Sequence, residues 1–116
     1  MLNLEVIEEL KALPADNGGD LFTQFAKMFL LAYPEHLKQI ETYLNRSDCI
    51  SLEREAHTLK SVCANLGAMS LADLARNIEH IARMRDLSGV SSLVSEMKAN
   101  QPLVHKALGR LLPELD

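Results

Sequence analysis

Apolar residues recur every three or four positions along most of this chain. The longest run of this kind extends from Phe22 to Leu44, and similar runs follow it as far as Leu111. An α-helix turns once in ~3.6 residues, so this spacing places the apolar side chains on one face of each helix. No segment shows the sustained alternation of apolar and polar residues that indicates a strand. The pattern therefore predicts an all-α protein.

Short polar or glycine-containing breaks separate the periodic segments at residues 14–19, 45–48, 65–70 and 85–89. Between these breaks the pattern predicts helices over residues 3–13, 21–44, 51–65, 71–84 and 88–112. A chain of 116 residues is long enough for one domain with its own core. We therefore expect a single domain over residues 1–116, folded as an up-and-down antiparallel four-helix bundle with a short extra N-terminal helix.

Several residues predict how individual helices begin, bend and end. Asp20 is placed to cap the second helix, and Ser70 is placed to cap the fourth. Gly67 suits a left-handed end of the third helix. Pro34 lies inside the second helix, where the apolar spacing continues across it, so we expect a kink rather than a stop. Pro102 is expected to interrupt the last helix, and division into two helices is one form of this interruption.

The charge balance argues against several kinds of partner. The chain has 12 basic and 16 acidic residues, a formal net charge of -4, and no clustered basic face for nucleic acid. No apolar run approaches the ~20 residues of a membrane span, and the N-terminal stretch MLNLEVIEEL lacks the pattern of a signal peptide. We therefore expect a cytoplasmic protein that contacts neither nucleic acid nor membrane.

Cys49 and Cys63 are expected to be reduced thiols, with Cys63 in the core.

Motifs for metal or nucleotide chemistry are missing from the sequence. Carboxylate-bridged metal bundles use Glu-x-x-His pairs, but none of His36, His57, His80 and His105 has an acidic residue three positions before it. There is no glycine-rich phosphate-binding loop and no hydrolase motif. We expect no metal ligands and no ATP-using activity in this chain.

The stretch AHTLKSVCANLGA carries an unusual polar pair within a helical pattern. At ~100° per residue, His57 points away from the apolar stripe of its helix, with Lys60 ~60° to one side and Ser61 ~40° to the other. Ala64 lies almost in line with His57, so small side chains flank the imidazole and leave room for a partner. The arrangement fits an exposed nucleophile served by a cation. It also fits a solvent-facing histidine with an incidental lysine, and spacing alone favours this plainer interpretation.

A resemblance to a known family favours the interpretation of His57 as a nucleophile. AHTLKSVCANLGA resembles the signature of histidine phosphotransfer (HPt) domains: His-x-Leu-Lys, a small residue, and then Leu-Gly. DLFTQFAKMFLLAYPEHLKQIETYL resembles the long helix that precedes the signature in the family, including its proline, and LADLARNIEHIARM resembles the helix that follows it. The resemblance covers nearly the whole chain and implies a four-helix bundle that acts in two-component phosphorelays.

The resemblance implies a phosphoryl carrier. His57 would take a phosphoryl group on Nε2 from the aspartate of a receiver domain and pass it to a second receiver, and Lys60 would stabilise the phosphoryl oxygens. The receiver would supply Mg²⁺, so this chain would need no cofactor of its own. Gly67 matches the glycine that closes the active helix.

Glu79 matches a family position that bonds the other ring nitrogen of the histidine, which would make Nε2 the nucleophile. On the sequence alone, an ordinary surface glutamate paired with Arg76 or Arg83 is an equal alternative. Arg83 is a weaker candidate for a role near the phosphoryl group. Ser61 departs from the family pattern, in which glycine is most frequent at that position.

The expected partners are receiver domains of response regulators or hybrid kinases, and we expect a monomer because the active face must stay free. The docking surface would surround His57 and include Glu53, Arg54, Ser61, Ala64 and Gly67. An alternative from another class is a helical adaptor that binds receivers without carrying phosphate. The presence of both His57 and Lys60 argues against this alternative.

Overall fold

The computed structural model describes residues 2–14 and 19–112. The regular secondary structure of these residues is α-helical, apart from an isolated bridge between Pro14 and Asp20, and short turns connect the helices. The helices are α1 (Leu4–Lys11), α2 (Leu21–Asn45), α3 (Cys49–Leu66), α4 (Met69–Arg83) and α5 (Val90–Leu111). The all-α prediction is confirmed.

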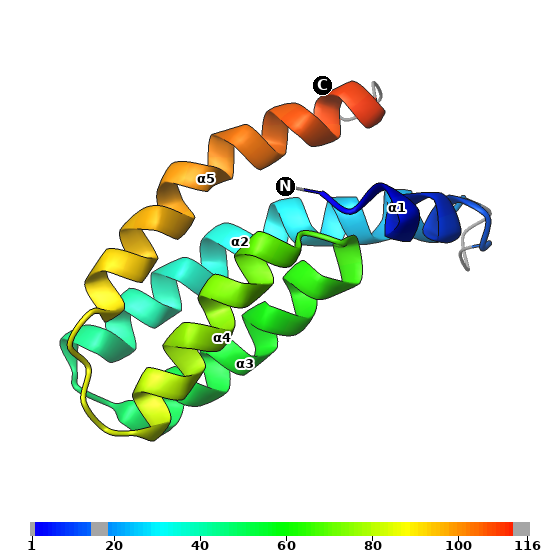
Figure 1. Cartoon of the computed structure of the whole chain (residues 1–116). Helices are drawn as coiled ribbons and strands as arrows, with labels where there is room; N and C mark the ends of the chain where they lie inside the picture. The colour runs from blue at the N-terminus through cyan, green and yellow to red at the C-terminus, as the bar shows by residue number, and fades with distance from the viewer. Residues whose placement is uncertain (1, 15–18, 113–116) are drawn as a thin grey trace.

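The four longer helices form one elongated bundle with extents of 43 × 24 × 21 Å. Successive helices from α2 to α5 run in opposite directions, and α1 packs beside the beginning of α2 (Figure 1). α3 and α4 pack against each other along their length, so side chains from these two helices can meet at the surface between them.

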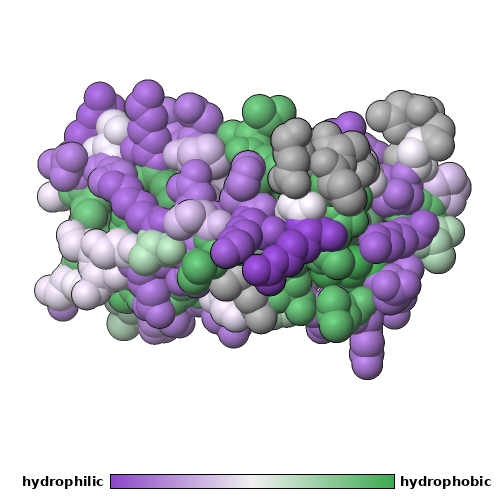
Figure 2. All heavy atoms as spheres, turned by 90° about the horizontal axis from the view of Figure 1, so that it is seen from above, coloured by the Kyte–Doolittle hydropathy of each residue, from purple (hydrophilic) through white to green (hydrophobic). Residues whose placement is uncertain are grey.

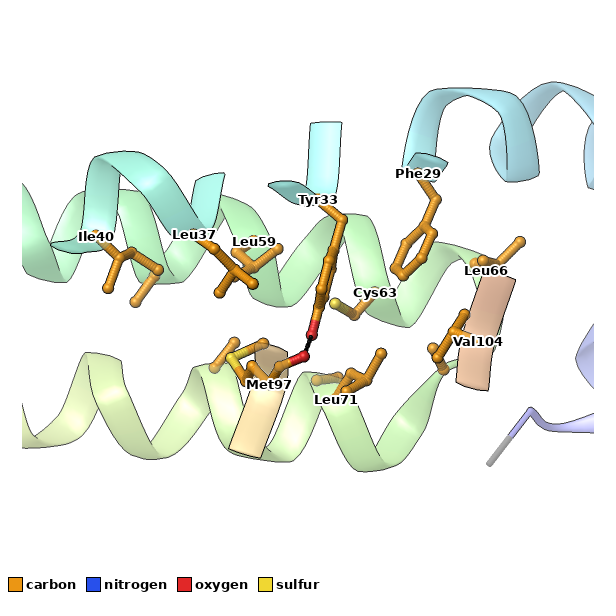
Figure 3. Close-up of a cluster of buried hydrophobic side chains, with 14 of the residues drawn as sticks. Phe29, Tyr33, Leu37, Ile40, Leu59, Cys63, Leu66, Leu71, Met97 and Val104 are labelled. Atoms are coloured by element: carbon orange, nitrogen blue, oxygen red, sulfur yellow. Dashed lines mark hydrogen bonds between the residues drawn. The ribbon is translucent and has the colours of Figure 1, made fainter. Parts of the chain in front are cut away.

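The periodic apolar positions form the core of the bundle. The stripe expected on α3 is fully buried and consists of Leu52, Ala56, Leu59, Cys63 and Leu66. Large buried side chains from the other helices pack around it (Figure 3). Each such leucine or phenylalanine contributes roughly 1.5–3 kcal/mol through the area removed from water. The hydroxyl of Tyr33 on α2 donates to the backbone carbonyl of Met97 on α5 at 2.7 Å, which satisfies both groups inside the core (Figure 3).

The turn from α3 to α4 differs from the sequence prediction. Gly67 has the expected left-handed conformation, with φ of 84°. The backbone N–H of Ala68 then donates to the carbonyl of Cys63 at 2.9 Å, and α4 begins at Met69 without a side-chain cap. The prediction that Ser70 caps α4 is therefore wrong, because the tight turn at Gly67 brings the chain into helical geometry before Ser70 is reached.

Proline residues lie inside two of the helices, at Pro34 in α2 and Pro102 in α5. Pro102 neither ends nor divides α5, contrary to the expected interruption. A proline removes one backbone hydrogen bond, but Met97, Val104 and Leu108 on both sides of it are fully buried. Their packing against the bundle keeps the helix continuous.

The face of the molecule seen from above combines hydrophilic side chains with apolar areas, which are broader on the right of the view (Figure 2). Within the described ranges, no helix is both long enough and apolar enough to span a membrane.

Burial raises the pKa of the Cys63 thiol to about 12, whereas Cys49 at the start of α3 is half-buried.

Candidate functional site

His57 and Glu79 face each other across the groove between α3 and α4. His57 lies on the side of α3 opposite its buried stripe, and its side chain is 60% exposed. The side chain of Glu79 on α4 is only 8% exposed. The packing of the two helices therefore exposes the imidazole of His57 to solvent and places the nearly buried carboxylate of Glu79 next to it.

Glu79 accepts hydrogen bonds from both residues of the HPt-like signature. Nδ1 of His57 lies 2.7 Å from one carboxylate oxygen of Glu79, and Nζ of Lys60 lies 2.8 Å from the other. The interpretation of Glu79 as the partner of the histidine ring agrees with this geometry. Arg83 also reaches Glu79, with Nη2 at 3.4 Å, but Glu79 is nearly buried, so the alternative of an ordinary surface glutamate is wrong. Arg76, the other partner considered, pairs with Asp73.

The protonation state of Glu79 determines which nitrogen of His57 is free. Burial opposes ionisation of this carboxyl group, but hydrogen bonds from Lys60 and His57 outweigh burial and lower its pKa from the ordinary value of 4.5. An ionised carboxylate can only accept hydrogen bonds, so Nδ1 of His57 carries the proton. In the neutral ring, Nε2 therefore keeps its lone pair and points away from Glu79.

A second ion pair joins the two helices one turn away. Nε of Arg83 on α4 donates to Glu53 on α3 at 2.8 Å. Glu53 precedes His57 by four residues and so lies on the same helix face. Sequence analysis placed Glu53 in the docking surface and Arg83 near the phosphoryl group, but no spacing within either helix indicated that they pair.

An open hollow of about 490 Å³ lies beside the exposed imidazole. Its walls come from both helices and are formed by His57, Lys60, Arg76, Asn77, Glu79, His80 and Arg83. The basic side chains outnumber the single carboxylate in this wall, which favours an anionic group. Among the residues that the structure describes, no group of three or more His, Cys, Asp or Glu side chains is arranged to hold a metal ion.

The predicted docking residues differ in their accessibility. Arg54 and Ser61 are exposed, and Ala64 is half-buried. The hydroxyl of Ser61 bonds to the backbone carbonyl of His57 at 3.4 Å. Gly67 is buried, and its carbonyl accepts from the N–H of Asn3 at 2.8 Å. Gly67 therefore lies outside the exposed face, because the N-terminal segment covers it, and it serves to end α3.

Of the remaining histidines, His80 lines this hollow, whereas His36 and His105 lie outside it. His80 and His105 are exposed. His36 on α2 is half-buried and bonds through Nδ1 to Glu55 on α3. Sequence analysis did not identify this second His–Glu pair, because its members come from different helices and fit no motif.

A helical bundle that exposes one imidazole beside a lysine and holds it with a carboxylate has the features of a phosphotransfer domain. The sequence profile of the Hpt domain matches residues 24–114, which is most of the chain. The chain belongs to the Hpt domain family, the histidine phosphotransfer proteins of phosphorelays. Proteins of this family are phosphoryl carriers that interact with receiver domains, and they are not kinases.

Two individual proteins show this relationship. The chain is 29% identical over 85 residues to the phosphotransferase RcsD of Escherichia coli strain K12. That match covers 69% of this chain but 10% of RcsD, so the chain spans about a tenth of that relative. The crystal structure of histidine-containing phosphotransfer protein B (HptB) from Pseudomonas aeruginosa PAO1 superposes with a TM-score of 0.83, at 24% identity, over 94% of this chain and 91% of that one. This similarity establishes the bundle fold.

Proposed function

We propose that His57 accepts a phosphoryl group from the aspartate of one receiver domain and passes it to the aspartate of another. The observation that supports this proposal is that the imidazole of His57 is hydrogen-bonded to Glu79 through Nδ1 and is still exposed to solvent. The side chain of His57 is 60% exposed, while its Nδ1 lies 2.7 Å from a carboxylate that is itself nearly buried. This arrangement leaves Nε2 accessible to a large partner.

The chemistry is a transfer between two nucleophiles. The lone pair of Nε2 forms a bond to phosphorus as the bond between phosphorus and the aspartyl oxygen breaks, and the aspartate leaves with the electron pair. His57 keeps its proton on Nδ1, so the phosphorylated ring carries a positive charge that Glu79 stabilises. The reverse step delivers the phosphoryl group to the second receiver.

Lys60 provides positive charge where negative charge develops on the phosphoryl oxygens. Its Nζ is bonded to Glu79 at 2.8 Å, and its side chain is 26% exposed, so the ammonium lies at the edge of the hollow beside His57. A cation held in this position stabilises the transferring group without large rearrangement. The proposal assigns the Mg²⁺ to the receiver domain, and this chain contributes Lys60, Glu79 and the nucleophile.

The docking surface in this proposal is the exposed face of α3 around His57, with Glu53, Arg54, Ser61 and Ala64. Small residues at Ser61 and Ala64 keep this face low, so a receiver can bring its aspartate close to Nε2. Serine at position 61 preserves this access because its hydroxyl bonds back to the carbonyl of His57. The chain in this role is a carrier that draws its phosphoryl group from a receiver and not from ATP.

Incubation with receiver domains tests this function. A panel of purified receivers, phosphorylated on aspartate with radiolabelled acetyl phosphate, is mixed with the wild-type chain and with His57→Gln. We expect acid-labile, base-stable label on the wild-type chain and none on the variant. Label that persists in His57→Gln, or that never reaches the wild-type chain from any receiver, contradicts the proposal. Stable binding of receivers without label would instead identify an adaptor.

A further inference from the structure

The ion pair between Glu53 and Arg83 lies directly beside the exposed ring of His57. Glu53 is one helical turn before His57 on α3, and Arg83 is one turn after Glu79 on α4. The guanidinium donates from Nε to Glu53 at 2.8 Å and from Nη2 to Glu79 at 3.4 Å. Arg83 thus connects the carboxylate that supports the imidazole to a second carboxylate on the open face.

The pair is accessible to whatever occupies the hollow. The side chain of Arg83 is 58% exposed and that of Glu53 is 33% exposed, and Arg83 forms part of the wall that His57 and Lys60 also line. Ion pairs with this exposure contribute little to stability and exchange partners easily. An arginine in such a pair can turn toward a phosphate, for which its planar donors are well suited.

Charges at the site change sharply when His57 is phosphorylated. Before transfer, Lys60 and Arg83 are paired with Glu79 and Glu53, and Arg76 in the same wall is paired with Asp73. A phosphoryl group adds close to two negative charges. The carboxylate of Glu53, one turn from the ring, then repels the new anion and also competes with it for Arg83.

We propose that Glu53 and Arg83 set how strongly the site holds the phosphoryl group, with Arg83 exchanging its bond to Glu53 for one to the phosphoryl oxygens. This inference rests on the proposed function of His57. Arg83 stabilises the phosphorylated state, and Glu53 weakens this stabilisation by retaining the guanidinium. The opposing pair suits a carrier, which must release the group as readily as it accepts it.

The equilibrium occupancy of the phosphorylated state reports this interaction directly. Phosphoramidate transfers its phosphoryl group to Nε2 and releases ammonia, so the chain can be phosphorylated without a receiver. At fixed concentrations of phosphoramidate and ammonia, the phosphorus NMR signal of phosphohistidine gives the ratio of phosphorylated to free chain. A cation close to the phosphoryl oxygens raises this ratio, whereas a nearby anion lowers it.

Substitutions of the pair should shift the ratio of phosphorylated to free chain in opposite directions. Arg83→Ala should lower it roughly threefold and Glu53→Gln should raise it by a similar factor, as expected for exposed charges. Arg83→Lys should restore most of the shift, because it keeps the charge. The double substitution should differ from the sum of the single ones, because removing Glu53 matters mainly through Arg83.

Matched controls come from another exposed ion pair between helices. Lys98 on α5 bonds to Glu41 on α2 at 2.7 Å, with side chains 51% and 42% exposed, away from the α3–α4 groove. Lys98→Ala and Glu41→Gln should leave the ratio of phosphorylated to free chain unchanged while changing stability as little as the test variants do. Thermal melting of each variant shows that it is folded.

The outcomes separate the inference from the function on which it rests. A ratio of phosphorylated to free chain that is the same in wild type, Arg83→Ala and Glu53→Gln overturns the inference and leaves the carrier function intact. A wild-type chain that gains no phosphoryl group on His57 overturns both. Shifts of equal size in the Lys98 and Glu41 controls also overturn the inference, because they would reflect net charge alone.

Discussion

The two His–Glu pairs of this protein use the same contact but present the imidazole in different ways. In each pair, Nδ1 of a histidine meets Oε2 of a glutamate on a neighbouring helix, and α3 contributes one member to both. The side chain of His57 is 60% exposed over a glutamate that is 8% exposed, whereas His36 and Glu55 are 18% and 19% exposed. The ring of His57 is therefore open to solvent, whereas the ring of His36 is largely enclosed.

Two further features separate His57, the proposed carrier residue, from His36. A carboxylate on Nδ1 fixes the orientation and tautomer of either ring. His57 also has Lys60 three residues later and an open hollow beside it, while His36 has the uncharged Gln39 at that position. Access to Nε2 together with a cation therefore distinguishes the proposed carrier from a structural pair.

Removal of the cation beside His57 should have the largest effect on transfer. Lys60→Ala should slow phosphoryl transfer from a receiver by roughly 10- to 100-fold, because charge on the phosphoryl oxygens loses its nearest stabilising donor. Single-turnover transfer from a phosphorylated receiver measures this rate. Lys38→Ala, which removes an exposed lysine close to His36, is the control and should transfer at the wild-type rate. A Lys60→Ala chain that matches the control would disprove the electrostatic role.

Neutralising the supporting carboxylate should have a smaller effect. Glu79→Gln keeps an oxygen that can accept from Nδ1 of His57 but loses the charge that stabilises the phosphorylated ring, so transfer should slow about tenfold. The matching change in the other pair, Glu55→Gln, should leave the transfer rate unchanged. Equal slowing by the two substitutions would mean that the contrast between the pairs is wrong.

The ionised state of Glu79 also makes a pH-dependent contribution to stability. Because its folded pKa is lowered from 4.5, ionised Glu79 stabilises the fold above that pH, and this contribution is lost as the pH falls through the lowered value. The free energy of unfolding should therefore differ most between wild type and Glu79→Gln above pH 4.5. Urea titrations at several pH values measure it, and a difference that stays constant into the acid range would contradict the prediction.

Breaking the enclosed pair should affect stability and not transfer. His36→Gln removes the ring that bonds the half-buried Glu55, which should cost about 1 kcal/mol and lower Tm by about 4 °C. Thermal unfolding followed by circular dichroism measures the shift. A transfer rate that falls together with Tm would show that His36 takes part in the chemistry.

The sequence predicted those features that depend on one helix at a time. The outward position of His57 and the buried stripe of α3 follow from helical periodicity alone. The start of α4 depends on the turn at Gly67, so the capping residue predicted at Ser70 was wrong. The continuity of α5 across Pro102 depends on neighbouring helices. Contacts between helices determine these features, and a periodic pattern does not contain them.

Contacts between helices also determine the site around His57, and helical periodicity does not predict them. The position of Glu79 on α4 allowed either a bond to His57 or a bond to Arg83, and only the packing of α3 on α4 shows that it makes both. The bond from Arg83 to Glu53 joins residues thirty positions apart. No spacing rule within one helix connects them, so the pair became visible only in the structure.

Placing a lysine beside the enclosed histidine should have the smallest effect. Gln39→Lys gives His36 a lysine at the same spacing as Lys60 has from His57. In a His57→Gln background, this variant should still gain no phosphoryl group from receivers or phosphoramidate, because the ring of His36 remains enclosed. Mass spectrometry under alkaline conditions detects the modification. A phosphorylated His36 would show that the cation matters and that access does not.

The central claim is that phosphorylation is confined to Nε2 of His57. Nitrogen–proton NMR spectra of the imidazole rings follow His36, His57, His80 and His105 together in one sample before and after treatment with phosphoramidate. The account predicts that free His57 carries its proton on Nδ1 and that phosphorus then couples to its Nε2 alone. Phosphorylation on Nδ1 of His57, or on any other histidine at a comparable rate, would contradict it.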